Sequence, residues 1–148
     1  MTYFKLLIML HVLFVALYVG SSAGLGILWS RNRQGTPEER LPDVEAMLAI
    51  SKRFGVLASS LVLLVGILML INQPAMLGWG ALFYLKIILG FVMIGFTHVA
   101  HARLIRLQSA LAGGTASPSG EKMMDLTRWL LPVLGVIVII LGVWHGHA

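Results

Sequence analysis

Cysteine is missing from all 148 residues of the sequence. Without a thiol the chain can form no disulfide, no thiolate metal site and no iron–sulfur cluster, and it cannot attach a c-type haem covalently. Any metal or redox centre must therefore be held by histidine, methionine, lysine or tyrosine side chains.

Charged residues are also scarce, at 11% of the chain, whereas 58% of the residues are hydrophobic. A chain this poor in charge is too apolar to form a water-soluble globule, so we expect an integral membrane protein. The formal charge of +5 could suggest nucleic-acid binding, but the positive residues lie between apolar stretches, where they set membrane topology. We therefore expect no nucleic-acid partner.

Acidic residues number only six, and all lie in or near the first and third connections between apolar stretches. No span holds a carboxylate, so we do not expect proton pumping through a carboxylate relay, although histidine and lysine can pass single protons. The chain also lacks a nucleotide-binding glycine motif and a serine or cysteine nucleophile motif. Whether it is an enzyme stays open.

Four apolar stretches are each long enough to cross about 30 Å of hydrocarbon as a helix. The first is too long for the core of a secretory signal, so we expect it to be retained. An all-α, antiparallel up-down bundle is the natural fold for four such helices, in a single domain over residues 1–148. The predicted helices cover residues 3–29, 45–72, 79–106 and 124–146.

The connections and the small residues add detail to this bundle. Asp43 is the expected N-cap of the second helix, and "NQPAMLGWG" predicts a tight turn between the second and third helices. Small residues allow helix backbones to approach closely. We expect such contacts at "GSSAG" (20–24) and at Gly90, Gly95, Gly135 and Gly142.

Positive residues crowd around the first and third connections, and the second connection has none. By the positive-inside rule, the first and third connections are cytoplasmic and both termini are extracytoplasmic. The residues concerned are Arg31, Arg33, Arg40, Lys52 and Arg53 around the first connection, and Arg103, Arg106, Lys122 and Arg128 around the third.

Titratable side chains interrupt the apolar stretches, and such groups usually face the bundle interior or a wet cavity. At 100° per residue, Lys86 and His101 fall in one sector of the third helix, with His98 beside it. His11 and Tyr18 are seven residues apart and share one face of the first helix. We therefore expect a polar stripe on each of these two helices.

Depth divides these groups into two candidate sites. His11 and Lys86 lie at one level near the outer surface, while His98 and His101 lie about 17 to 23 Å further in. His145 ends the fourth helix near the outer boundary. The predicted outer site contains His11, Lys86, Tyr18 and His145, and the inner site contains His98 and His101 near Lys52 and Arg53.

Most of these groups also have a plainer interpretation, as side chains near a helix end that reach water or lipid headgroups. His11 differs, because its short imidazole lies well inside an apolar face, which favours a functional or cofactor role. The plainer interpretation applies to Lys86, His98, His101, His145 and His147.

The spacing of these residues resembles two families of small bacterial membrane proteins, the CopD-like copper-resistance proteins and the HemJ-type protoporphyrinogen oxidases. "LHVLFVALYVGSS" resembles their first helix, "KRFGVLASSLVLLVGILML" their second, and the run from "GWGALFYLK" to "FTH" the HemJ third helix. Tyr18 stands where these families usually have tryptophan. The matched residues are His11, Tyr18 and Gly20 in the first helix, Arg53 and Gly66 in the second, and Trp79, Lys86 and His98 in the third.

The resemblance implies a bundle in the bacterial inner membrane that holds haem b through histidines of the first or third helix. Lys86 would pair a propionate or act as a second ligand. The expected cofactor-binding residues are His11, Tyr18, Arg53, Lys86, His98 and His101, and the expected metal ligands are His11, His98, His101 and His145.

Three functions stay open at this point. The first is haem-b-based electron transfer or membrane-coupled porphyrin or quinol redox chemistry. The second is a non-catalytic subunit of a larger membrane complex, with the lipid bilayer and a homo-oligomer or other subunits as partners. The third is copper handling, for which the candidate ligands are His11, His145, His147, Met9 and Met76.

Overall fold

Helices make up every regular element of the computed structural model, which describes residues 2–32, 35–114 and 121–145. Within these ranges there is no strand. The second span combines two α-helices with a π-helical turn between them. In order, the elements are α1 (Thr2–Asn32), α2 (Pro37–Ile50), the π-helix η1 (Ser51–Val56), α3 (Leu57–Asn72), the 3-10 helix η2 (Pro74–Gly78), α4 (Ala81–Ala112) and α5 (Glu121–His145).

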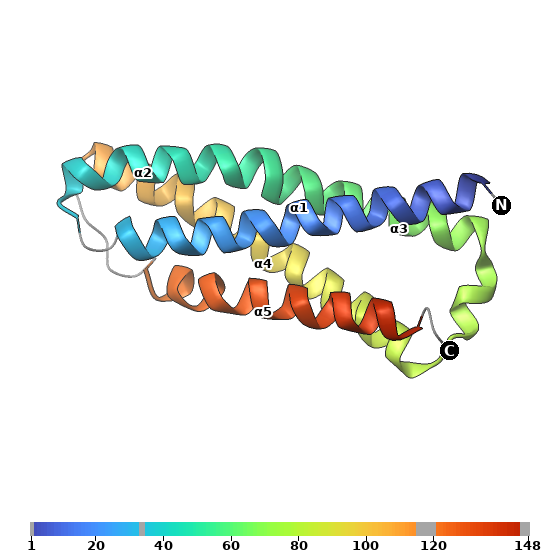
Figure 1. Cartoon of the computed structure of the whole chain (residues 1–148). Coiled ribbons are helices and arrows are strands. Elements are labelled where there is room, and N and C mark those ends of the chain that lie inside the picture. Colours follow the sequence, from blue (N-terminus) through green and yellow to red (C-terminus); the bar gives the residue numbers. More distant parts are fainter. Residues whose placement is uncertain (1, 33–34, 115–120, 146–148) are drawn as a thin grey trace.

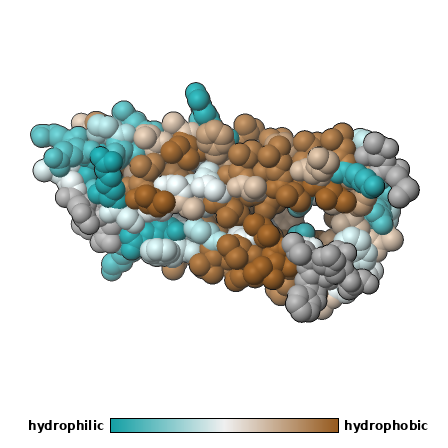
Figure 2. Space-filling model, in the orientation of Figure 1, coloured by the Kyte–Doolittle hydropathy of each residue, from teal (hydrophilic) through white to brown (hydrophobic). Residues whose placement is uncertain are grey.

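Within the described residues, four helices are long and apolar enough to cross a membrane, which confirms the predicted all-α four-helix bundle. Hydrophobic side chains cover the middle of the molecule, and hydrophilic ones gather at one end (Figure 2). Many large apolar side chains are exposed, as lipid-facing residues must be. The four spans are Tyr3–Asn32, Glu38–Asn72, Ala81–Ala112 and Met124–Gly142.

The second span begins earlier than predicted, because a capping box starts it at Pro37 rather than at residue 45. The Thr36 hydroxyl accepts from the Glu39 backbone N–H at 3.4 Å, and the Glu39 carboxylate accepts from the Thr36 N–H at 2.9 Å. The prediction that Asp43 caps this helix is wrong. The length of the apolar run sets where the membrane span lies, but the capping box sets where the helix begins. The polar first turns of α2 therefore extend beyond the hydrocarbon.

The two ends of the bundle differ in packing (Figure 1). We call the end where α1 leads to α2 and α4 leads to α5 the basic end, and the end where η2 joins α3 to α4 the hairpin end. At the basic end the Trp29 indole is fully buried and donates to the Asp125 carboxylate at 3.0 Å. The core at this end consists of Trp29, Val44, Met47, Leu104, Leu111 and Met124.

The helices α3 and α4 diverge toward the hairpin end. α4 packs against α2, η1 and α5 but barely touches α3, whereas α1 packs against α3 and α5 (Figure 1). The connection between α3 and α4 is therefore not the predicted tight turn but the one-turn helix η2, which spans the gap. Gly80, with φ at 91°, then reverses the chain into α4.

Close helix contacts form at some of the expected glycines and not at others. A Cβ on Gly135 would lie 2.6 Å from a methyl carbon of Val19, so α1 and α5 meet there. The predicted contacts at Gly20, Gly24, Gly90 and Gly95 are wrong, since a Cβ at each would have nothing within 4 Å. Helical position alone does not say which small residue meets a neighbour.

Gly135→Ala tests this packing, with Gly95→Ala as the matched control. The new methyl group at residue 135 meets Val19, whose χ1 is fixed in a helix, and we expect it to destabilise the fold by about 1 to 3 kcal/mol. The midpoint of thermal unfolding in detergent should fall for Gly135→Ala and stay unchanged or rise for Gly95→Ala. Equal midpoints for the two variants would contradict the close approach of α1 and α5.

Candidate functional site

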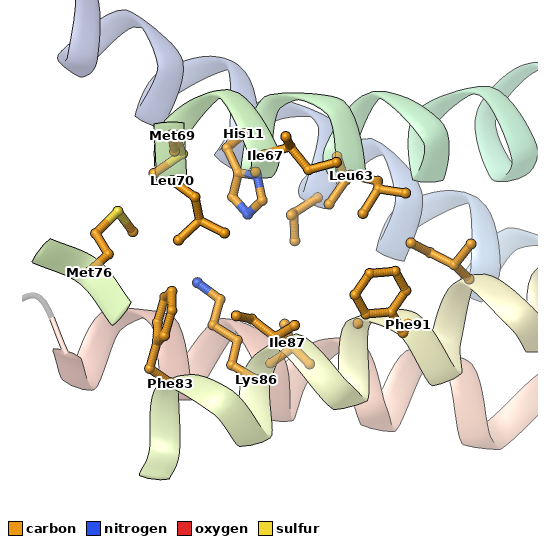
Figure 3. Close-up of a pocket in the computed structure, with 16 residues that line it drawn as sticks. His11, Leu63, Ile67, Met69, Leu70, Met76, Phe83, Lys86, Ile87 and Phe91 are labelled. Atoms are coloured by element: carbon orange, nitrogen blue, oxygen red, sulfur yellow. The ribbon is translucent and has the colours of Figure 1, made fainter. Parts of the chain in front are cut away.

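A pocket of about 200 Å³ lies where α3 and α4 diverge (Figure 3). α1, α3 and α4 form its walls, Met76 of η2 closes it toward the hairpin end, and Val138 of α5 contributes to its lining. The lining is apolar apart from His11 and Lys86, and no acidic side chain lies among the described residues that form it. Two nitrogen-bearing side chains thus face a hydrocarbon-lined space.

His11 reaches this pocket from α1 and lies against Gly66 of α3. A Cβ on Gly66 would be 3.7 Å from Cε1 of the ring, in ordinary contact, so the absence of a side chain there lets the imidazole pack close to α3. Nδ1 is buried without a hydrogen-bond partner in the described part of the chain. One ring nitrogen points into the pocket, toward Lys86 (Figure 3).

Lys86 enters from α4 on the opposite side, half-buried, with its amine directed toward His11 (Figure 3). A Cβ on Gly142 of α5 would be 3.1 Å from Nζ, so the amine lies beside α5 as well. His11 and Lys86 therefore line the same pocket from opposite sides, at the shared level that the sequence predicts. An amine and an imidazole facing each other can bind an anionic or metal-bearing guest.

Two thioethers share the pocket. Met76 was expected on this side of the molecule, and Met69 was missed, although it is three residues after Gly66 and so on the same face of α3. Met9, in contrast, is 69% exposed and points away from the bundle.

Tyr18 does not line this pocket but lies deeper in the bundle. It is buried, donates to the Met93 carbonyl at 3.0 Å and also forms a hydrogen bond with the Thr97 hydroxyl. Tyr18 therefore joins α1 to α4 by hydrogen bonds, on the side of the pocket nearer the basic end. It is separate from the predicted outer site.

The inner histidines turn to different sides of α4. His101 is half-buried and forms a 3.0 Å hydrogen bond with Ser51 of η1, whereas His98 is exposed and bonds the Ile94 carbonyl of its own helix. Arg53 is exposed and is not part of the pocket lining. No three histidine or acidic side chains of the described residues come close enough to hold a metal ion.

His145 is the last described residue of α5, and its side chain, like all of His147, lies outside the described part. No protein-family model, curated protein or solved structure matches this chain. The resemblance to the CopD-like and HemJ-type families therefore stays a prediction.

The unpaired Nδ1 gives a prediction for the ligand-free protein. Replacing His11 by leucine removes a buried nitrogen without a partner, so we expect the unfolding midpoint in detergent to stay the same or rise. Tyr18→Phe, which breaks satisfied hydrogen bonds, should cost about 1 to 3 kcal/mol. A loss in His11→Leu as large as in Tyr18→Phe would mean that the imidazole is a structural core group.

Proposed function

We propose that this protein binds haem b in the pocket and serves electron transfer or membrane-coupled redox chemistry on a porphyrin or quinol. The observation that carries the proposal is the imidazole of His11, one nitrogen of which faces the amine of Lys86 across an apolar cavity. Haem b needs a neutral imidazole, a dry pocket and a cation near its propionates.

The donor groups suit haem b, whereas the cavity of about 200 Å³ is smaller than a porphyrin, so α3 and α4 would have to move apart to admit it. His11 would be the iron ligand, and Lys86 would pair a propionate or take the second ligand position. The bare backbones of Gly66 and Gly90 leave the walls of α3 and α4 flat beside the cavity. Haem b supplies one-electron transfer when bound, and the chain supplies the ligand, the counter-charge and the exclusion of water.

The location of this chemistry is part of the proposal. The positive residues favour a cytoplasmic basic end, which places the pocket in the extracytoplasmic half of a bacterial inner membrane. A haem held at that depth would lie within reach of a redox carrier dissolved in the lipid.

The absorption spectrum of purified protein, oxidised and then reduced with dithionite, tests the proposal. We expect a haem b Soret band in the wild type and about a hundredfold weaker haem binding in His11→Ala, as expected for losing about 2.8 kcal/mol of ligation. Lys86→Gln should weaken binding less. His98→Ala is the matched control, because this imidazole is exposed on α4, and it should bind haem like the wild type.

Two outcomes would contradict the haem proposal. One is a wild-type protein without a Soret band after expression with sufficient haem and after titration with haemin. The other is equal loss of haem in His11→Ala and His98→Ala.

Copper handling is the second candidate, because an imidazole and two thioethers line the same pocket. Imidazole and thioether groups suit Cu(I). Joint replacement of Met69 and Met76 by leucine separates the two candidates, since it would abolish Cu(I) binding while leaving His11 and Lys86 for haem. Metal analysis and the Soret absorbance of the same samples give the answer.

A further inference from the structure

Lys86 holds an amine inside an apolar pocket, and the acidic residues of the chain lie far from it. All six belong to α2 or to the first turns of α5, at the basic end, whereas the pocket adjoins the hairpin end (Figure 1). A cation in hydrocarbon is costly unless an opposite charge pairs with it. A guest that carries a negative charge would supply what the pocket lining lacks.

Two glycines leave space around this amine. A Cβ on Gly142 of α5 would lie 3.1 Å from Nζ of Lys86, closer than an ordinary carbon contact, so a side chain there would push the amine aside. Gly90 lies one turn after Lys86 on α4, and a Cβ on it would have nothing within 4 Å. The amine therefore has room at α5 and open volume beside it along α4.

Beyond the amine the pocket is apolar, and it continues toward the basic end. Gly90 and Ile94 line it one and two turns after Lys86 on the same face of α4. A second cavity of about 40 Å³ shares these two residues and reaches Tyr18. The hydroxyls of Tyr18 and Ser59, which contribute to its lining, are bonded to other groups. This space therefore suits a hydrocarbon chain better than water.

The size of the pocket narrows the class of guest. At about 30 Å³ for each water-sized group, a volume of about 200 Å³ has room for roughly seven such groups. A carboxyl group with a short run of methylenes fits this volume, whereas the glycerol and two chains of a phospholipid do not. Ile67 and Phe91 line the pocket and are also exposed on the apolar surface, so the rest of a longer chain can leave between α3 and α4.

We propose that the pocket binds a single-chain alkyl carboxylic acid, with its carboxyl group between Lys86 and His11 and its first methylenes directed toward the basic end. Lys86 donates to one carboxylate oxygen, and a ring N–H of His11 donates to the other. The acid and the amine share one proton, so the pair brings no net charge into the hydrocarbon. The inference goes beyond the proposed function, because it needs no haem and uses the pocket at its present size.

Equilibrium binding of radiolabelled dodecanoic acid tests this site in the complete chain. The purified protein is incorporated into phosphatidylcholine nanodiscs without added haem, and the acid taken up by protein-free nanodiscs is subtracted. We expect saturable binding. Unlabelled dodecanoic acid should displace the probe, whereas methyl dodecanoate, which has the same chain without the negative charge, should not.

Two variants should each weaken this binding about tenfold. Lys86→Gln removes the positive charge and keeps a polar side chain. Gly90→Leu fills the volume beside the amine without removing any polar group, and the open space at this residue allows the fold to be preserved. Lys5→Gln is the matched control and should bind like the wild type, because Lys5 is exposed on α1 and does not line the pocket.

The proposal is overturned if the wild type binds no more acid than protein-free nanodiscs, or if the methyl ester displaces the probe as well as the acid does. It is equally overturned if Lys86→Gln and Lys5→Gln bind with the same affinity, or if Gly90→Leu binds like the wild type. Because this binding is measured without haem, its failure leaves the haem proposal intact, and a missing Soret band would leave the acid site intact.

Discussion

Hydrocarbon offers no hydrogen bonds, and this constraint determines where each polar side chain of the four spans lies. Tyr18 and Thr97 satisfy each other and the Met93 carbonyl between α1 and α4, and Ser51 pairs with His101 between η1 and α4. His98, without an inward partner, bonds the carbonyl one turn back on its own helix. The exceptions in the described chain are Nδ1 of His11 and Nε of Arg128, which are buried without a hydrogen-bond partner.

The contrast between the two ends of the bundle follows from how the second span packs. Its α2 half lies against α4 and closes the basic end around Trp29 and Met47, while its α3 half follows α1 and leaves α4. The change takes place at η1, where Gly55 and Ser51 lie against α4. A tight end gives the bundle its stability, and the open end has room for a guest.

Much of this fold could be predicted from the sequence, because the lengths of the apolar runs set the number of helices. The shared level of His11 and Lys86 also followed from counting residues along two parallel helices. The start of α2 was missed, although Thr36 and Glu39 carry the capping-box pattern. Tyr18 was placed with His11 because both share a face, yet seven residues separate them by about 10 Å along the axis.

Other features could not have been found by counting. A π-helix changes the helical phase within the second span, so the pairing of Ser51 with His101 depends on a backbone irregularity that apolar periodicity does not reveal. The divergence of α3 and α4 depends on tertiary packing, and with it the roles of Met69 and Gly66 as pocket walls.

The gap between α3 and α4 has a consequence for how a guest arrives. Ile67 and Phe91, which line the pocket, are also 46% and 56% exposed on the apolar surface, so the opening adjoins acyl chains. A hydrophobic molecule would enter by lateral diffusion within the leaflet. Its effective concentration is then its mole fraction in lipid, and occupancy depends on partitioning and membrane composition rather than on aqueous solubility.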